Sequence, residues 1–217
     1  LSVLATDIPL EIIEIEAGEP HKHIDTCTQV WYALSELGAD RKSLLINIGG
    51  GVVTDLGGFV ASTYMRGIPF INIPTSLLAM VDASVGGKTG VDLGALKNLV
   101  GVINNPKGVL IYPDFLATLP TEELRSGMAE MFKHGLISDE GYWHKMCNLS
   151  ELTEAHLGSL IYESVIIKNE VVTQDPTEKG LRKTLNYGHT LGHAIESYCL
   201  QNPNRERLLH GEAIAIG

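Results

Sequence analysis

Three histidines near the carboxyl end of the chain have spacing that suits a metal site. His189 and His193 stand four residues apart, so a helix would place both imidazoles on one face, about 6 Å apart, and His210 follows on a later element. Imidazole nitrogens, one carboxylate oxygen and an open position suit catalytic zinc, a Lewis acid for a substrate hydroxyl. The first candidate carboxylate is Glu130, with Lys133 one turn further along. Histidine pairs at this spacing are also common on ordinary helix surfaces, so the spacing alone leaves metal binding open.

A second chemical feature is the run of three glycines at 49–51, which follows the apolar stretch 44–48. Glycine lets backbone N–H groups approach a pyrophosphate, and the amino end of a following helix contributes about half a positive charge. The spacing differs from the G-x-G-x-x-G fingerprint, so a tight turn without a ligand stays an alternative. A later cluster, 86–90, lacks the first glycine of a P-loop, and we interpret it as a flexible loop that presents Lys88.

The elements that must position these groups fall into two domains. Up to residue 119, short apolar runs alternate with helical patterns, which is typical of a parallel sheet covered by helices on both faces. Strands are expected over 10–16, 44–48, 70–73 and 109–112, and helices over 25–37 and 56–65. From 120 to 217 the pattern is helical, with helices expected from residue 121 and over 157–172 and 185–200.

The composition restricts the class of protein. The 217 residues carry 16 Lys+Arg against 26 Asp+Glu, a formal net charge of −10, and no basic stripe with interleaved aromatics, so nucleic acid is not expected as a partner. With 44% hydrophobic residues the chain is too apolar for disorder, yet it has no apolar run of the ~20 residues that cross a bilayer. Three widely spaced cysteines predict neither disulfides nor a thiolate metal site, and we expect a cytoplasmic protein.

Several longer motifs resemble those of 3-dehydroquinate synthases. In chain order they are GGGVVTDLGGFVASTYMRG (49–67), IPTSLLAMVDASVGGKTGVD (73–92), KNLVG (97–101), LRSGMAEMFKHG (124–135), LRKTLNYGHTLGHAIE (181–196) and LHGEAIAIG (209–217). The resemblance implies an α/β fold with two domains, a Rossmann-like nucleotide-binding domain over 1–119 and an all-helical metal-binding domain over 120–217. The active site would lie in the cleft between them, and the protein would be a homodimer.

The resemblance also implies a reaction of the shikimate pathway, which supplies aromatic amino acids. The enzyme would be a carbon–oxygen lyase that converts 3-deoxy-D-arabino-heptulosonate 7-phosphate to 3-dehydroquinate with loss of phosphate. Its cofactors would be NAD, used catalytically and regenerated, and Zn²⁺ or Co²⁺. The substrate is an anionic sugar-acid phosphate, which four cationic side chains of the motifs would suit.

The matching motifs imply roles for individual residues. The metal ligands would be Glu130, His189 and His210, which leaves His193 for proton transfer or hydrogen bonding. The residues expected around the substrate are Asp82, Lys88, Asn98, Lys133, Lys168, Glu178, Arg182 and Asn186, with Arg66 reaching the substrate phosphate of the partner protomer. The residues expected to contact NAD are Glu19, Lys22, Gly50, Gly51, Asp55, Thr75, Ser76 and Leu78.

The chain departs from the family in its extent. The family's opening βα unit and its last helices have no counterpart here, and there is no initiator methionine, so we expect a fragment or part of a longer protein. Three alternatives stay open: a metal-dependent polyol dehydrogenase, a related sugar-phosphate cyclase and an inactive fragment that only binds nucleotide or zinc. The cations at positions 88, 133, 168 and 182 argue against the dehydrogenase, because they suit an anionic substrate.

Overall fold

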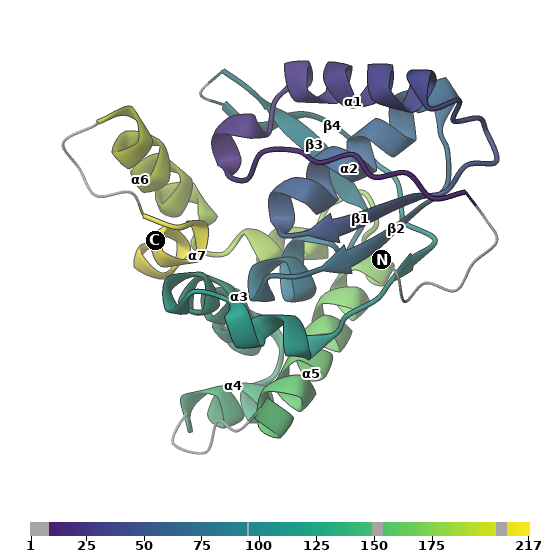
Figure 1. Ribbon diagram of the computed structural model, residues 1–217. Helices are drawn as coiled ribbons and strands as arrows, with labels where there is room; N and C mark the ends of the chain where they lie inside the picture. Colours follow the sequence, from purple (N-terminus) through teal and green to yellow (C-terminus); the bar gives the residue numbers. More distant parts are fainter. Residues whose placement is uncertain (1–8, 95, 149–153, 203–207) are drawn as a thin grey trace.

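The computed structural model describes residues 9–94, 96–148, 154–202 and 208–217 (Figure 1). Strands and helices are mixed as far as η4, and every described element after η4 is helical. This confirms the expected fold class. The elements are η1 (Glu19–His21), α1 (Ile24–Glu36), β1 (Leu45–Gly49), α2 (Gly51–Thr63), η2 (Tyr64–Arg66), β2 (Phe70–Pro74), η3 (Ala79–Ala83), β3 (Lys88–Leu93), β4 (Leu96–Ile103), β5 (Gly108–Val109), η4 (Pro113–Thr118), α3 (Thr121–Ser138), α4 (Glu140–Cys147), α5 (Glu154–Gln174), η6 (Leu181–Asn186), α6 (His189–Gln201) and α7 (His210–Ile216).

A parallel sheet with the strand order β1–β2–β5 forms the centre of the amino-terminal part. β1 and β2 pair in register, so that Asn47 lies beside Asn72 and its side-chain amide donates to Oδ1 of Asn72 at 2.9 Å. Helix α2 covers this face closely, because a Cβ at Gly57 would lie 2.0 Å from the Asn47 amide oxygen. The glycines of α2 therefore allow the helix to press onto the sheet.

The sheet differs in two ways from the sequence-based expectation. Ile46 and Ile48 point away from α2 and are 39% and 52% exposed, so the described part of the chain covers β1 on one face only. The strand expected over 109–112 is reduced to the two residues of β5. Leu110 and Tyr112 are exposed, and beyond β5 the backbone N–H of Leu110 still donates to the carbonyl of Asn72 at 2.8 Å.

The strand expected over 10–16 is absent, although its alternating pattern has a structural meaning. Ile13 and Ile15 pack against the hydrophobic cluster of α1 and α2, which contains Val30 and Phe59. An extended segment can bury every second side chain in this way without the hydrogen bonds of a strand. The alternation of apolar residues over 10–16 therefore predicted correctly that one side of the segment is buried. It predicted wrongly that the segment pairs with a sheet.

An antiparallel hairpin, β3–β4, replaces the flexible loop expected around Lys88. Lys88 is the first residue of β3 and pairs with Ile103, and Gly90 pairs with Gly101. A Cβ at Gly101 would lie 2.3 Å from the carbonyl oxygen of Thr89, so the glycines that resemble loop residues let the two strands approach. The hairpin lies over α2 and gives Lys88 a fixed backbone (Figure 1).

The helical part confirms the helices expected from residue 121 and over 157–172, as α3 and α5. The helix expected over 185–200 begins only at His189, since the preceding residues form the 3₁₀ turn η6 and Gly188 has a φ of 79°. The three cysteines are unpaired, as expected. Within the described ranges, no helix combines the length and apolarity that a membrane span needs.

The domain boundary between residues 119 and 120 stays a prediction. One hydrophobic cluster contains Leu77 and Met80, which precede the boundary, together with Met131, Tyr142 and Ile161, which follow it. The π-helical turn η3 thus precedes the predicted boundary in the sequence, but its side chains pack into the hydrophobic core of the helical part. Such turns are frequent at functional sites, and this one carries Asp82.

Candidate active site

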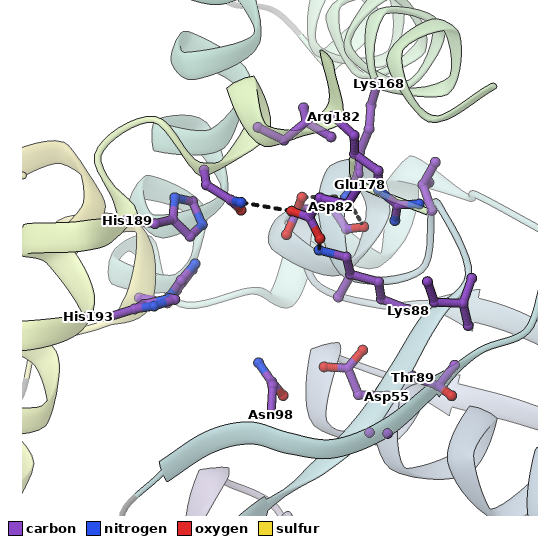
Figure 2. Close-up of a pocket in the computed structure, with 18 of the residues that line it drawn as sticks. Asp55, Asp82, Lys88, Thr89, Asn98, Lys168, Glu178, Arg182, His189 and His193 are labelled. Carbon is purple, nitrogen blue, oxygen red and sulfur yellow. Dashed lines mark hydrogen bonds and ion pairs between the residues drawn. The ribbon is translucent and has the colours of Figure 1, made fainter. Parts of the chain in front are cut away.

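A cleft of about 550 Å³ lies between the hairpin and α2 on one side and the helical part on the other (Figure 2). Of the residues that the motifs indicated, the amino-terminal part contributes Asp55, Asp82, Lys88 and Asn98 to its lining. The helical part contributes Lys133, Lys168, Glu178, Arg182, Asn186, His189, His193 and His210. The fold therefore brings together residues that lie far apart in the sequence, while their roles in binding stay predictions.

The three histidines meet at the amino ends of α6 and α7. The ring centroids of His189 and His193 are 5.0 Å apart, and that of His210 lies 5.3 Å and 5.6 Å from them. One nitrogen of each ring lies within 4.8 Å of the others, which suits a shared metal ion. Gly192 allows the approach, because a Cβ there would lie 2.7 Å from the side chain of Ile214 on α7.

Glu130, on α3, lies beside one member of this group, His210. Its side chain is fully buried, and Oε2 forms an ion pair with Lys133. Oε1 has no hydrogen-bond partner in the described part of the chain and lies 3.9 Å from Nε2 of His210. A buried carboxylate oxygen without a donor is costly in free energy, and a cation between it and the imidazole would remove that cost. The donor set and the unsatisfied oxygen therefore fit a divalent metal ion.

Two of the three histidines, His189 and His193, have protonation states that suit metal binding. Burial, with a smaller effect of the Lys133 ammonium, lowers the pKa of His189 to about 4. Burial and the neighbouring His189 also lower the pKa of His193. Both rings are therefore neutral at pH 7, and the neutral imidazole is the form that binds metals. Because His193 is exposed to the cleft, its ring can also accept a proton there.

A second group of charges surrounds Asp82 on the π-helical turn. Lys168 is buried and donates to the backbone oxygen of Asp82 at 2.6 Å and also to its carboxylate. Burial would raise the pKa of Asp82, yet the ammonium groups of Lys168 and Lys133 hold that pKa below its usual range. Asp82 is therefore ionised at neutral pH and holds Lys168 at the cleft.

Lys88, Glu178 and Asn186 form a third group at the mouth of the cleft. Lys88 pairs with Oε2 of Glu178, and the side-chain amide of Asn186 donates to Oε1 at 2.7 Å (Figure 2). Arg182 lies behind them, almost fully buried, and donates to the backbone oxygens of Pro176 and Gly86 at 2.9 Å and 2.8 Å. Arg182 thus fixes the glycine turn that leads into β3.

Several of the predicted NAD residues follow the carboxyl ends of β1 and β2, where parallel sheets bind nucleotides. Gly50 precedes α2, whose amino end has no side-chain cap, and a Cβ at Gly50 would lie 3.3 Å from Oγ of Ser76. The backbone N–H of Thr75 donates to the carbonyl of Gly49 at 2.9 Å, which joins the two strand ends. Uncapped N–H groups beside glycine fit a pyrophosphate. The predicted residues Gly51 and Leu78 flank this edge at the starts of α2 and η3.

Lys22 connects the amino end of the chain to this nucleotide side. Its buried ammonium donates to Asp55 at 2.5 Å and to Oδ1 of Asn98 at 2.6 Å. Burial disfavours the charge, but Asp55 and Glu19 raise the pKa of Lys22, so it stays protonated. In Figure 2, Asn98 and Asp55 lie in the lower part of the view, below Lys88 and to the right of His193.

Arg66 is a predicted site residue that lies outside this arrangement. It is exposed on the turn η2 and does not line the cleft. Its φ of 70° is in the left-handed region, as are those of Asn98 (52°) and Glu178 (58°). Non-glycine residues seldom adopt this conformation, and they cluster at functional sites. Contact between Arg66 and a partner protomer stays a prediction.

Sequence reasoning assigned no role to Lys97 and Glu196, although both lie inside the quoted motifs. Nζ of Lys97 contacts Oε1 of Glu196 at 2.6 Å and Oε1 of Glu19 at 2.9 Å. Glu196 is only 3% exposed. The available signal was its position three residues after His193, one helical turn away, which places a carboxylate next to the histidine group.

Comparison with known proteins agrees with this architecture. Residues 12–126 match the model of the 3-dehydroquinate synthase N-terminal domain, and residues 127–217 match that of the C-terminal domain. The chain belongs to the 3-dehydroquinate synthase family. A synthase of this name from Parabacteroides distasonis is 48% identical over 220 residues, which cover 99% of this chain and 62% of that protein. One from Streptococcus suis is 47% identical over 209 residues, which cover 95% and 58%.

The chain thus spans about three fifths of the length of the curated relatives it matches. Among solved structures, it resembles the 2-epi-5-epi-valiolone synthase ValA from Streptomyces hygroscopicus, which has NAD⁺ and Zn²⁺ bound, with a TM-score of 0.83 and 35% identity over 92% of this chain and 56% of that one. It also resembles a 2-deoxy-scyllo-inosose synthase complexed with carbaglucose-6-phosphate, NAD⁺ and Co²⁺, with a TM-score of 0.82 and 31% identity over 95% and 56%.

A more distant likeness concerns the dehydrogenase alternative. The NADH-dependent butanol dehydrogenase A of Thermotoga maritima has a TM-score of 0.62 with 15% identity, over 88% of this chain and 53% of that one. At this identity only the fold is shared. The fold alone therefore does not separate synthases from dehydrogenases, and it is the match to both family models that assigns the chain to its family.

Proposed function

We propose that this chain carries the cofactor and metal centre of a 3-dehydroquinate synthase. The reaction would be the cyclisation of 3-deoxy-D-arabino-heptulosonate 7-phosphate to 3-dehydroquinate with loss of phosphate, which makes the enzyme a carbon–oxygen lyase. The single observation that carries this proposal is the unsatisfied oxygen of Glu130, which faces His210, a residue that lines the same cleft as the lysines. The family match and the NAD⁺ and metal in the two solved synthases support it.

The proposed metal ligands are Glu130, His189 and His210. A bound Zn²⁺ or Co²⁺ would supply Lewis-acid chemistry at a substrate hydroxyl. His193 stands beside these ligands with a neutral ring, and it would take up the hydroxyl proton as a general base. Lys133, already paired with Glu130, would hold that carboxylate ionised for the metal.

The lysines would bind the anionic groups of the substrate. In the described structure Lys88, Lys133 and Lys168 are paired with Glu178, Glu130 and Asp82, which all belong to the same site. Oxygens of the substrate carboxylate and phosphate would compete with the Asp and Glu side chains for these lysines. Each lysine would then exchange one anionic partner for another and would not be left buried without one. Such fixed donors would hold the substrate in one conformer, which is a large part of catalysis by positioning.

NAD would bind opposite the histidines. Its pyrophosphate would lie at Gly50, Gly51 and the amino end of α2, and Asp55 and Lys22 would meet its other groups. The cofactor supplies a temporary oxidation, because it accepts a hydride and returns it. We further propose that the protein is cytoplasmic and acts as a homodimer, in which Arg66 reaches the partner's substrate.

A single assay separates the proposed function from its alternatives. The 217-residue chain, loaded with Zn²⁺, is given the heptulosonate phosphate and substoichiometric NAD⁺, and inorganic phosphate and 3-dehydroquinate are measured. Release of more phosphate than the NAD⁺ supplied supports the synthase. Net NADH formation with simple polyols supports a dehydrogenase, turnover of another sugar phosphate supports a related cyclase, and binding of zinc and NAD⁺ without turnover supports an inactive fragment.

A further inference from the structure

Glu196 occupies an unusual position for a side chain without an assigned role. It lies on α6, is 3% exposed, and uses its two oxygens for two different partners. Oε1 accepts from Nζ of Lys97 on β4 at 2.6 Å, and Oε2 lies 3.5 Å from Nδ1 of His210 on α7. The carboxylate therefore joins the hairpin of the nucleotide side to the histidine group.

The contacts continue on both sides of Glu196. The other ring nitrogen of His210, Nε2, faces Oε1 of Glu130 at 3.9 Å. On the opposite side, Lys97 also contacts Oε1 of Glu19 at 2.9 Å. A continuous series of charged groups thus runs from η1 and β4 through α6 to α7 and α3. His210 lies within this series, with Nδ1 toward Glu196 and Nε2 toward Glu130.

We propose that Glu196 is a positioning residue that fixes the ring of His210 for metal binding and ties this orientation to the hairpin through Lys97. The inference rests on the proposed metal centre. A histidine that binds a metal through one nitrogen usually donates the proton of the other to a carboxylate, which fixes both tautomer and ring orientation. Glu196 faces Nδ1, so Nε2 is left to accept the metal on the side where Glu130 lies.

The anchoring by Lys97 gives Glu196 its own fixed position. A carboxylate that was held by a single flexible contact could move with the imidazole when the ring rotated, and it would then not fix the orientation of the ring. Oε1 is held by an ammonium on a different structural element, and that ammonium is itself held by Glu19. Movement of the hairpin relative to α6 would therefore change the position of Glu196 and, through it, the ring of His210.

The test measures metal affinity and coordination without any turnover. The Zn²⁺ dissociation constant of the 217-residue chain is determined by competition with a chromophoric chelator for wild type, E196Q, K97M and the control E163Q. Glutamine keeps the size of Glu196 and an oxygen for Lys97, but it loses the charge that faces Nδ1 of His210. Glu163 is paired with Lys145 at 2.7 Å on the surface of α5, so E163Q removes a similar ion pair elsewhere.

We expect E196Q to bind Zn²⁺ about 10- to 100-fold more weakly than wild type, K97M to lose a smaller factor, and E163Q to match wild type. With Co²⁺, the visible absorption bands of E196Q should shift, because the geometry around the ion changes. Equal affinity and an unchanged cobalt spectrum in E196Q would overturn the inference while leaving the metal centre intact. A wild-type chain that bound no divalent ion would overturn the proposed centre and this inference together.

A second measurement keeps the inference testable if E196Q does not fold, as thermal unfolding would reveal. Long-range ¹H–¹⁵N NMR spectra of the zinc-loaded wild type report which nitrogen of His210 carries the proton. We expect the proton on Nδ1, protected from exchange by Glu196, and the metal on Nε2. A proton on Nε2, or exchange of the Nδ1 proton at the rate of an exposed histidine, would overturn the inference.

Discussion

Oε1 of Glu130 lies 3.9 Å from Nε2 of His210, and within the described structure it is the oxygen of that carboxylate without a hydrogen-bond donor. The other oxygen, Oε2, is paired with Lys133. Burial and the neighbouring carboxylate of Asp82 raise the pKa of Glu130, so the metal-free site holds its charge at a cost. The relationship predicts that a divalent cation, and not a further hydrogen bond, satisfies this oxygen.

Glu130→Gln should therefore weaken Zn²⁺ binding by at least about 100-fold, because a charged ligand is replaced by a poor neutral one. The metal should also stabilise wild type and not the variant: at a Zn²⁺ concentration 100 times the dissociation constant, wild type should gain about 2.7 kcal/mol in free energy of unfolding. Calorimetric titration and thermal unfolding with and without chelator measure both effects. E163Q serves as the control, and equal zinc stabilisation of E130Q and wild type would contradict the ligand assignment.

His134 predicts a pH dependence of stability that is separate from the metal ligands' own titration. It is fully buried on α3, and its Nδ1 contacts Oγ of Ser164 at 2.8 Å. Burial, with the Lys133 and Lys168 charges, lowers the pKa of His134 to about 3. Between pH 6.5 and 3 the unfolded chain binds this proton and the folded chain does not. The contribution of His134 to the free energy of unfolding is therefore fully present above pH 6.5. Below that pH it falls by about 1.4 kcal/mol per pH unit.

The measurement compares urea unfolding of wild type and His134→Gln between pH 7.5 and 5, with chelator present in every sample. Carboxylate titrations are largely common to both proteins, so the difference between them isolates His134. We expect wild type to lose about 2 kcal/mol relative to the variant between pH 6.5 and 5. Parallel stability curves for the two proteins would show that folding does not lower the pKa of His134, and would contradict this prediction.

The features of this site that could be predicted from the sequence are those whose residues lie close together along the chain. His189 and His193 converge because four residues make about one helical turn. The glycine turn before α2 was visible because it follows an apolar strand. The contact of Lys97 with Glu196 was not visible, since 99 residues separate the partners and only the tertiary fold brings them together.

The hairpin was missed for a different physical reason. Residues 86–101 are rich in glycine, which is typical of loops, and the propensity of glycine for strands is low. In the structure Gly90 and Gly101 oppose each other, and a side chain at either would collide with the opposite backbone. The presence of glycine at these two positions is therefore explained by the close approach of the two strands, and not by a need for a flexible backbone. In the same way, the alternation of residues 10–16 reported burial correctly, but no strand pairs with it.

Lys168 and Asp82 predict a measurable charge coupling. Lys168 is buried, and the Asp82 side chain is 27% exposed. Removing one partner from a fully buried pair costs about 3–5 kcal/mol, and partial exposure of Asp82 reduces this, so Lys168→Met should cost about 2–3 kcal/mol of unfolding free energy. Asp82→Asn should recover part of that loss in the double variant, because no unpaired charge remains.

A double-mutant cycle by urea denaturation at pH 7 measures this coupling. The same cycle on the surface pair Lys145 and Glu163, whose side chains are 57% and 34% exposed, provides the matched control and should give about 0–1 kcal/mol. Equal coupling energies in the two cycles would contradict the view that Lys168 and Asp82 form a desolvated pair.

Gly211 predicts how sensitive the metal centre is to helix packing. It follows His210 in the first turn of α7, and a Cβ at this position would lie 1.9 Å from the carbonyl oxygen of Ser126 on α3. The backbone N–H of Gly211 also donates to Oγ of Ser126 at 3.0 Å. Gly211→Ala must push α7 away from α3, and the same displacement moves His210 away from Glu130. We therefore expect the variant to lose both stability and zinc affinity.

The control for this change is Gly108→Ala, since nothing lies within 4 Å of a Cβ built at Gly108. Gly211→Ala should lower the unfolding free energy by about 1–3 kcal/mol, as overpacking does, and should weaken Zn²⁺ binding by about tenfold or more. Thermal unfolding in chelator reports the first effect and chelator competition the second. If G211A lost stability but bound zinc as tightly as wild type, the position of α7 against α3 would not set the distance between His210 and Glu130, and the metal ligands would have to come from α6 and α7 alone.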